Sequence, residues 1–149
     1  MALAFGMWWI YFDFVARRPP KYGIGWIYAW NYLHMPLVMA VTATGAGILN
    51  TIANEQNVLP DSVRMLIAIS VGCSLIAIAL LESTLRREAD EPTHPRLSPG
   101  LKLVAALGAI GLGLWGSGLG AIALLSLLFS LLAIQMIYGL FVWFNMEID

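Results

Sequence analysis

The stretch LVAALGAIGLGLWGSGLGAIALLSLLFSLLAIQMIYGLFVWFNM, residues 103–146, decides the fold because it contains no Lys, Arg, Asp or Glu. About 20 apolar residues in a helix cross the hydrocarbon core of a bilayer, so this stretch is too long for one crossing. The segment WGSGLG, residues 115–120, lies in its middle, and its closely spaced small residues predict a turn. We therefore expect two membrane helices, over about 101–116 and 119–145, joined by a tight Gly-rich turn.

The composition of the whole chain also indicates a membrane protein. Of its 149 residues, 60% are hydrophobic and 11% are charged. A soluble domain has about 25% charged and 45–50% apolar residues. The net charge of −1 gives no basic balance, so we expect the lipid bilayer, and not nucleic acid, as a partner. The lone cysteine, Cys73, lies in an apolar run and is expected to be a packing residue.

Other stretches with few charges predict three further spans, at about 1–16, 25–49 and 62–85. The predicted fold class is therefore all-α, a polytopic transmembrane helix bundle of about five spans, forming a single membrane domain over 1–149. Residues 86–100 contain three prolines and many charges, which is typical of a solvated loop.

The basic residues predict how this bundle is oriented. In a five-span arrangement, the loop after the first span and the loop between the third and fourth spans lie on the same side. These loops and the residues beside them contain every basic residue except Arg64, namely Arg17, Arg18, Lys21, Arg86, Arg87, Arg96 and Lys102. Because cytoplasmic loops carry an excess of Lys and Arg, both loops and the C-terminus are expected in the cytoplasm and the N-terminus outside.

Small residues in the predicted spans indicate close helix packing. Ala105, Ala109 and Gly113 recur every four residues, and Ala68 precedes Gly72 by the same spacing. Helices in lipid gain little hydrophobic benefit from contact, so they use small residues to approach one another closely.

Two carboxylates lie near the predicted cytoplasmic ends of spans. Asp13 precedes Arg17 by four residues, and Glu82 precedes Arg86 by four, so each could form an ion pair along one helix face. Alternatively, Asp13 is a buried carboxylate facing another helix, because ionisable residues in spans often mark relays.

His34 lies near the bilayer middle, roughly 13 Å into the second span at 1.5 Å per residue. Asn31 precedes it by one turn, and Pro36 frees the backbone carbonyl of Tyr32. One hypothesis is a kinked helix in which His34 bonds Asn31 and a backbone carbonyl. Another is a proton or ion relay. Gln135, in the last span, is expected to form an interhelical hydrogen bond.

Motifs typical of enzymes are missing from the sequence, including a Walker loop, GxSxG and HExxH. A lone deep histidine also lacks a second axial ligand for haem, since His94 falls in the charged loop. We therefore expect a protein that is not an enzyme and that has no cofactor and no metal site.

Two segments carry a family resemblance. WWIYFD, residues 8–13, then a basic loop, then YLHMPLV, residues 32–38, followed by ATGAG, resembles the bacterial low-temperature-requirement A (LtrA) family. The motif positions are Trp8, Trp9, Tyr11, Phe12, Asp13, His34, Pro36 and Leu37. The resemblance is to the C-terminal part of a longer family protein with additional spans upstream. It implies a polytopic protein of the bacterial cytoplasmic (inner) membrane, linked by name to growth in the cold.

Two functions agree with these features. The first is a non-catalytic subunit, or an assembly or stabilising component, of a larger membrane complex with other membrane protein subunits as partners. The second is a proton- or ion-coupled transporter module that uses Asp13 and His34. A transporter is expected to place Asp13, His34 and Gln135 around one cavity, with Asn31 as a further polar contact.

Overall fold

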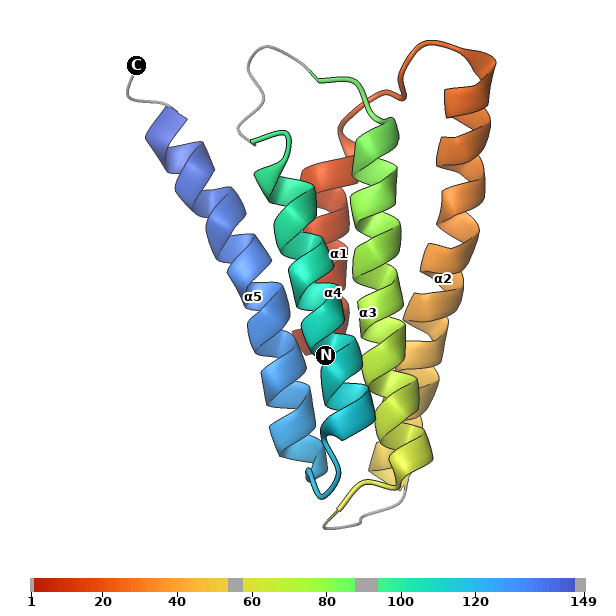
Figure 1. Cartoon of the computed structure of the whole chain (residues 1–149), viewed down its shortest axis with the longest axis vertical. Helices are drawn as coiled ribbons and strands as arrows, with labels where there is room; N and C mark the ends of the chain where they lie inside the picture. The colour runs from red at the N-terminus through yellow and green to blue at the C-terminus, as the bar shows by residue number, and fades with distance from the viewer. Residues whose placement is uncertain (1, 54–57, 88–93, 147–149) are drawn as a thin grey trace.

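The structure, a computed structural model, describes residues 2–53, 58–87 and 94–146, and it is helical. The chain forms, in order, α1 (Ala2–Tyr11), the π-helix η1 (Phe12–Ala16), α2 (Ile24–Ala53), α3 (Asp61–Thr84), α4 (Leu97–Trp115) and α5 (Ala121–Met146). The all-α prediction is confirmed (Figure 1). Predictions for residue 1, loop residues 88–93 and tail residues 147–149 lie outside the described ranges.

Four of these helices, α2 to α5, are long and apolar enough to cross a membrane. The continuous helical segment Ala2–Ala16 is shorter. At 1.5 Å per residue it extends about 22 Å, less than the hydrocarbon core of about 30 Å. Helix α1 contacts α5 and α3, and Figure 1 shows it extending along only part of the length of the bundle.

Helix α3 forms the centre of the bundle, between α2 and α4, and it also contacts α1 and α5. Its side chains are buried on most sides, with Ile67, Val71, Leu75 and Ile78 fully enclosed. A helix that is apolar all round is suited to this central place, because it has no polar face to present elsewhere.

Small residues set the distance between α3 and its neighbours. A Cβ added to Gly72 would lie 2.7 Å from Cγ1 of Ile110 on α4, and one added to Gly47 on α2 would overlap Cγ1 of Ile67. Ala68 and Gly113 also meet at the contact between α3 and α4. The small residues predicted to allow close packing therefore lie where the helices approach most closely.

The two basic segments lie side by side at one end of the bundle, which we call the basic end. The backbone N–H of Lys21 donates to the carbonyl of Thr84 at 2.9 Å, and that of Arg86 donates to Pro19 at 3.0 Å. Figure 1 shows that α5 finishes at this same end. The predicted placement of both loops on one side therefore agrees with the fold.

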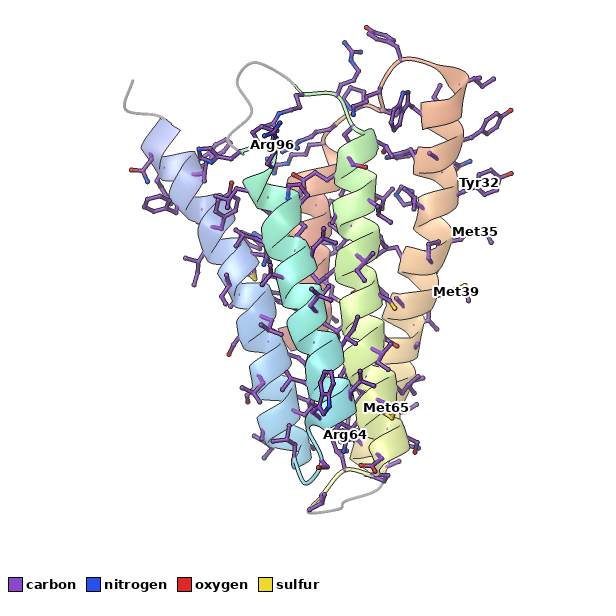
Figure 2. All side chains as sticks on the ribbon, in the orientation of Figure 1. Tyr32, Met35, Met39, Arg64, Met65 and Arg96 are labelled. Atoms are coloured by element: carbon purple, nitrogen blue, oxygen red, sulfur yellow. The ribbon has the colours of Figure 1, made fainter. Side chains whose placement is uncertain are left out.

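The opposite end contains the Gly-rich turn. Gly118 has a φ of +85°, a conformation that glycine adopts without a steric penalty. Arg64, the cation set apart from the others, is buried here, and its Nε donates to the carbonyl of Gly113 at 3.1 Å (Figure 2 labels Arg64). This carbonyl belongs to the last turn of α4, where backbone acceptors lack helical partners. Arg64 thus caps α4 while forming an ion pair with Asp61.

The fourth helix begins earlier than the sequence indicates. We expected it near 101, but α4 begins at Leu97, so the loop is shorter than 86–100. Pro99 falls in the first helical turn, where its missing N–H removes no intrahelical hydrogen bond. A proline that resembles a loop signal is therefore part of a helix start.

We predict that Gly72→Ala lowers the free energy of unfolding by about 1–3 kcal/mol, because the new methyl group overpacks the contact with α4. Gly45→Ala is the matched control, since a Cβ there meets open space. It should leave stability unchanged or raise it by up to about 1 kcal/mol, from helix propensity. Denaturation in detergent, followed by circular dichroism, measures both. Equal effects would contradict the close packing at Gly72.

Candidate functional site

A buried ion pair lies inside the basic end. Lys102 on α4 is 0% exposed, and its Nζ donates to Oε2 of Glu82 on α3 at 3.0 Å. The same Nζ donates to Oγ of Ser98, one turn earlier on α4, at 2.8 Å. A buried charge is costly unless it is paired and hydrogen-bonded, and Lys102 has both kinds of partner.

The helix η1 completes this cluster. Nζ of Lys102 lies 3.6 Å from the centroid of the Phe14 ring, a cation–π contact. Asp13, the preceding residue, is only partly buried, and the cations acting on it electrostatically are Arg17, Arg18 and Lys102. We call Asp13, Phe14, Glu82, Ser98 and Lys102 the charged cluster.

Helix α5 packs closely against Asp13 at Gly139. A Cβ added to Gly139 would lie 2.8 Å from Oδ2 of Asp13, so no larger residue fits there without a shift. Gln135, one turn earlier, is buried, and its Nε2 donates to the carbonyl of Leu101 at 3.2 Å. Gln135 thereby joins α5 to α4 beside the charged cluster. Its Oε1 is buried with no hydrogen-bond partner in the part of the chain that the structure describes.

The expected pairing of Glu82 with Arg86 is wrong. Helix α3 ends at Thr84, so Arg86 lies beyond the helix and the i,i+4 geometry no longer applies. Arg86 lies instead over the ring of Tyr22, with its guanidinium carbon 3.9 Å from the ring centroid. Glu82 points inward to Lys102.

A second polar contact joins the two motif segments. Nδ1 of His34 donates to the carbonyl of Trp30 at 2.7 Å, and the hydroxyl of Tyr11 on α1 lies 2.9 Å from Nε2. A carbonyl only accepts, so Nδ1 must carry a proton. In the neutral imidazole Nε2 is then an acceptor, and Tyr11 donates to it.

An open groove lies beside this contact, between α1 and α2. Its volume is about 390 Å³ and its lining is mostly apolar. The lining residues are Ala4, Met7, Trp8, Tyr11, His34, Leu37, Val38, Val41 and Thr42. We call this space the α1–α2 groove.

Asp13 and His34, the two residues proposed for a relay, are not brought together. Asp13 packs against α5 and belongs to the charged cluster, whereas His34 faces the α1–α2 groove. Asn31 is exposed on α2, and His34 bonds the carbonyl of Trp30 and not that of Tyr32. The carbonyl of Trp30 lies one helical turn back from His34, within direct reach of its ring.

The other motif positions surround these two contacts. Trp8 borders the groove and Leu37 lines it, while Pro36 and Phe12 are exposed. Trp9 is half-buried and its ring contacts Phe5. In the described part of the chain, no group of three or more His, Cys, Asp or Glu side chains is placed to hold a metal ion.

Sequence reasoning missed Lys102 as a buried residue. The available signal was its spacing of four from Ser98, which places the two on one helix face only if α4 starts before Ser98. With a helix start near 101, Ser98 falls in the loop, so the sequence does not indicate that it shares a helix face with Lys102.

We predict that Lys102→Met lowers the free energy of unfolding by about 3–5 kcal/mol, because it leaves the carboxylate of Glu82 buried without a cation. The double variant Lys102→Met with Glu82→Leu should recover most of that loss, since neither buried charge remains. Unfolding of both variants in detergent tests this. A single variant as stable as the wild type would show that the ion pair does not support the fold.

Comparison with known proteins places the chain in a family. The family model described as Bacterial low temperature requirement A protein (LtrA) matches residues 1–141. No curated protein and no solved structure matches the chain. The family match covers both motif segments, the charged cluster and the groove, and extends over most of the 149 residues. The chain therefore belongs to the bacterial LtrA family.

Proposed function

We propose that this protein is a non-catalytic subunit, with an assembly or stabilising role, of a larger membrane complex, and that it docks through the outward face of α2. The observation that carries the proposal is the composition of that face. Tyr28, Tyr32, Met35 and Met39 follow one another at spacings of four, three and four residues, and all are exposed. Figure 2 shows Tyr32, Met35 and Met39 pointing away from the bundle.

The same face carries smaller side chains further along α2. Thr42 and Ala46 continue the helical spacing from Met39, and both are exposed. The Thr42 hydroxyl donates to the carbonyl of Val38 at 2.8 Å, so its side chain is satisfied within its own helix. Small residues separated by four allow the backbones of two membrane helices to approach closely. Aromatic residues and methionine are enriched in protein interfaces.

The packing of α2 supports this proposal. Helix α2 packs chiefly on α3, and its outward face lies on the side away from that contact. The stripe from Tyr28 to Ala46 has the spacing of a coiled-coil seam, on which a second helix could lie along its length. We infer that a transmembrane helix of another subunit occupies it.

The polar contacts favour a subunit over a transporter. Lys102, Glu82, Tyr11 and His34 use their polar groups on one another or on nearby backbone. Asp13 lies against α5 and His34 lines the α1–α2 groove, so the two side chains do not share that groove. By the positive-inside rule, the proposal places the basic end in the cytoplasm.

We predict that Ala46→Leu removes co-purifying membrane proteins from the affinity-tagged chain, isolated from its native membrane in mild detergent. The larger side chain would hold a partner helix away from α2. Ala123→Leu is the matched control, because Ala123 is also exposed, on α5. Mass spectrometry of both preparations measures the partners.

The wild type and Ala123→Leu should retain the same partners, and Ala46→Leu should lose them. The proposal fails if the wild type purifies alone. It also fails if both variants retain partners equally.

A further inference from the structure

We propose that the α1–α2 groove binds a neutral, lipid-soluble molecule with a hydroxyl head, and that this hydroxyl donates a hydrogen bond to the phenolic oxygen of Tyr11. The site lies on the side of α2 that faces α1, and Thr42 lies at the edge that it shares with the proposed docking face. The inference does not depend on the subunit role proposed above. It follows from which polar hydrogens at the Tyr11–His34 contact are already used, from the charge of the groove's lining and from where the groove opens.

The polar hydrogens of Tyr11, His34 and Thr42 are already committed. The Tyr11 hydroxyl donates to Nε2 of His34, and Nδ1 of His34 donates to the carbonyl of Trp30. Thr42 donates to the carbonyl of Val38. Each hydroxyl oxygen still has accepting capacity. At this polar contact the groove therefore offers acceptors, and an occupant that bonds there must bring the donor.

The lining also selects against charge. None of its residues is Asp, Glu, Lys or Arg, and His34 is held with Nδ1 protonated and Nε2 accepting. A charged head group placed here would lose its hydration without gaining a counter-ion. This selects against phosphate and carboxylate head groups and favours a neutral donor, of which a hydroxyl is the commonest in lipid-soluble molecules.

The dimensions and position of the groove suit a molecule that arrives through the bilayer. Its volume of about 390 Å³ lies within the range of about 300–1,000 Å³ typical of small-molecule sites. Trp8 and Val38, both more than half exposed, border it on the outer surface of two apolar helices. The mouth therefore opens toward lipid.

Two kinds of molecule supply this chemistry. One is a quinol, in which the hydroxyl is on an aromatic ring that could stack on Trp8. The other is a glycerolipid with one unesterified hydroxyl. We use decylubiquinol and 1,2-dioctanoylglycerol as probes. Decylubiquinone and 1,2-dioctanoyl-3-acetylglycerol are their matched controls, because each lacks the hydroxyl donor while keeping the apolar body.

The experiment is native mass spectrometry of the protein released from detergent micelles, with each probe titrated separately. We expect one hydroxyl-bearing probe to bind about fivefold more tightly than its matched control, which is the factor that one net hydrogen bond supplies. Which of the two probes binds identifies the source of the ligand.

Two variants localise the binding. Val38→Trp should fill the groove and abolish binding, whereas Val104→Trp, on the exposed face of α4, should not change it. The double variant Tyr11→Phe with His34→Phe removes the Tyr11 hydroxyl and also Nε2 of His34, which the loss of Tyr11 alone would free as an acceptor. It should therefore bind a probe and its matched control equally. This last measurement is the ratio of the affinities for a probe and for its matched control. A general loss of stability lowers both affinities, so it leaves the ratio unchanged.

Three results would overturn the proposal. In the first, neither hydroxyl-bearing probe binds. In the second, each probe and its control bind the wild type equally. In the third, Val38→Trp binds as the wild type does.

Discussion

A lysine side chain that is completely enclosed, as Lys102 is, imposes a condition on everything around it. Its charge must find an anion, hydrogen-bond acceptors and a polarisable surface, or the bundle would not tolerate it. Glu82, Ser98 and Phe14 meet that condition from α3, α4 and η1. The basic end is thus fixed by one ammonium group with partners on three elements, while the rest of the bundle relies on close contact between small residues.

The charged cluster and the α1–α2 groove are linked through the first helical segment. Tyr11, at the end of α1, reaches His34 on α2, while Asp13 and Phe14, in η1, reach α5 and Lys102. The π-helix begins between the residue that contacts α2 and the residues that contact α5 and Lys102. Single π-helical turns are frequent at functional sites. The short helical segment Ala2–Ala16 therefore contributes side chains to both polar sites.

The sequence predicts the features that depend on local pattern. Hydropathy identifies the long helices, the small residues at 115–120 predict the turn, and the basic residues predict which loops lie together. It does not predict the contacts between helices, because periodicity does not determine which faces meet. Glu82 illustrates the difference: its spacing to Arg86 is correct for a helix, but α3 ends at Thr84 and Lys102 comes from another helix. Tyr11 and His34 are motif residues, but nothing in their spacing indicates that they touch.

The most direct test of this account is the reactivity of the lysines, Lys21 and Lys102, toward N-hydroxysuccinimide acetate. Lys21 is only partly buried and Lys102 is enclosed, although both belong to the basic end. Mass spectrometry of the folded protein in mild detergent should find acetylation at Lys21 and protection of Lys102, with both acetylated after denaturation. If Lys102 reacts as fast as Lys21 in the folded protein, it is not enclosed, and the charged cluster does not hold the bundle together.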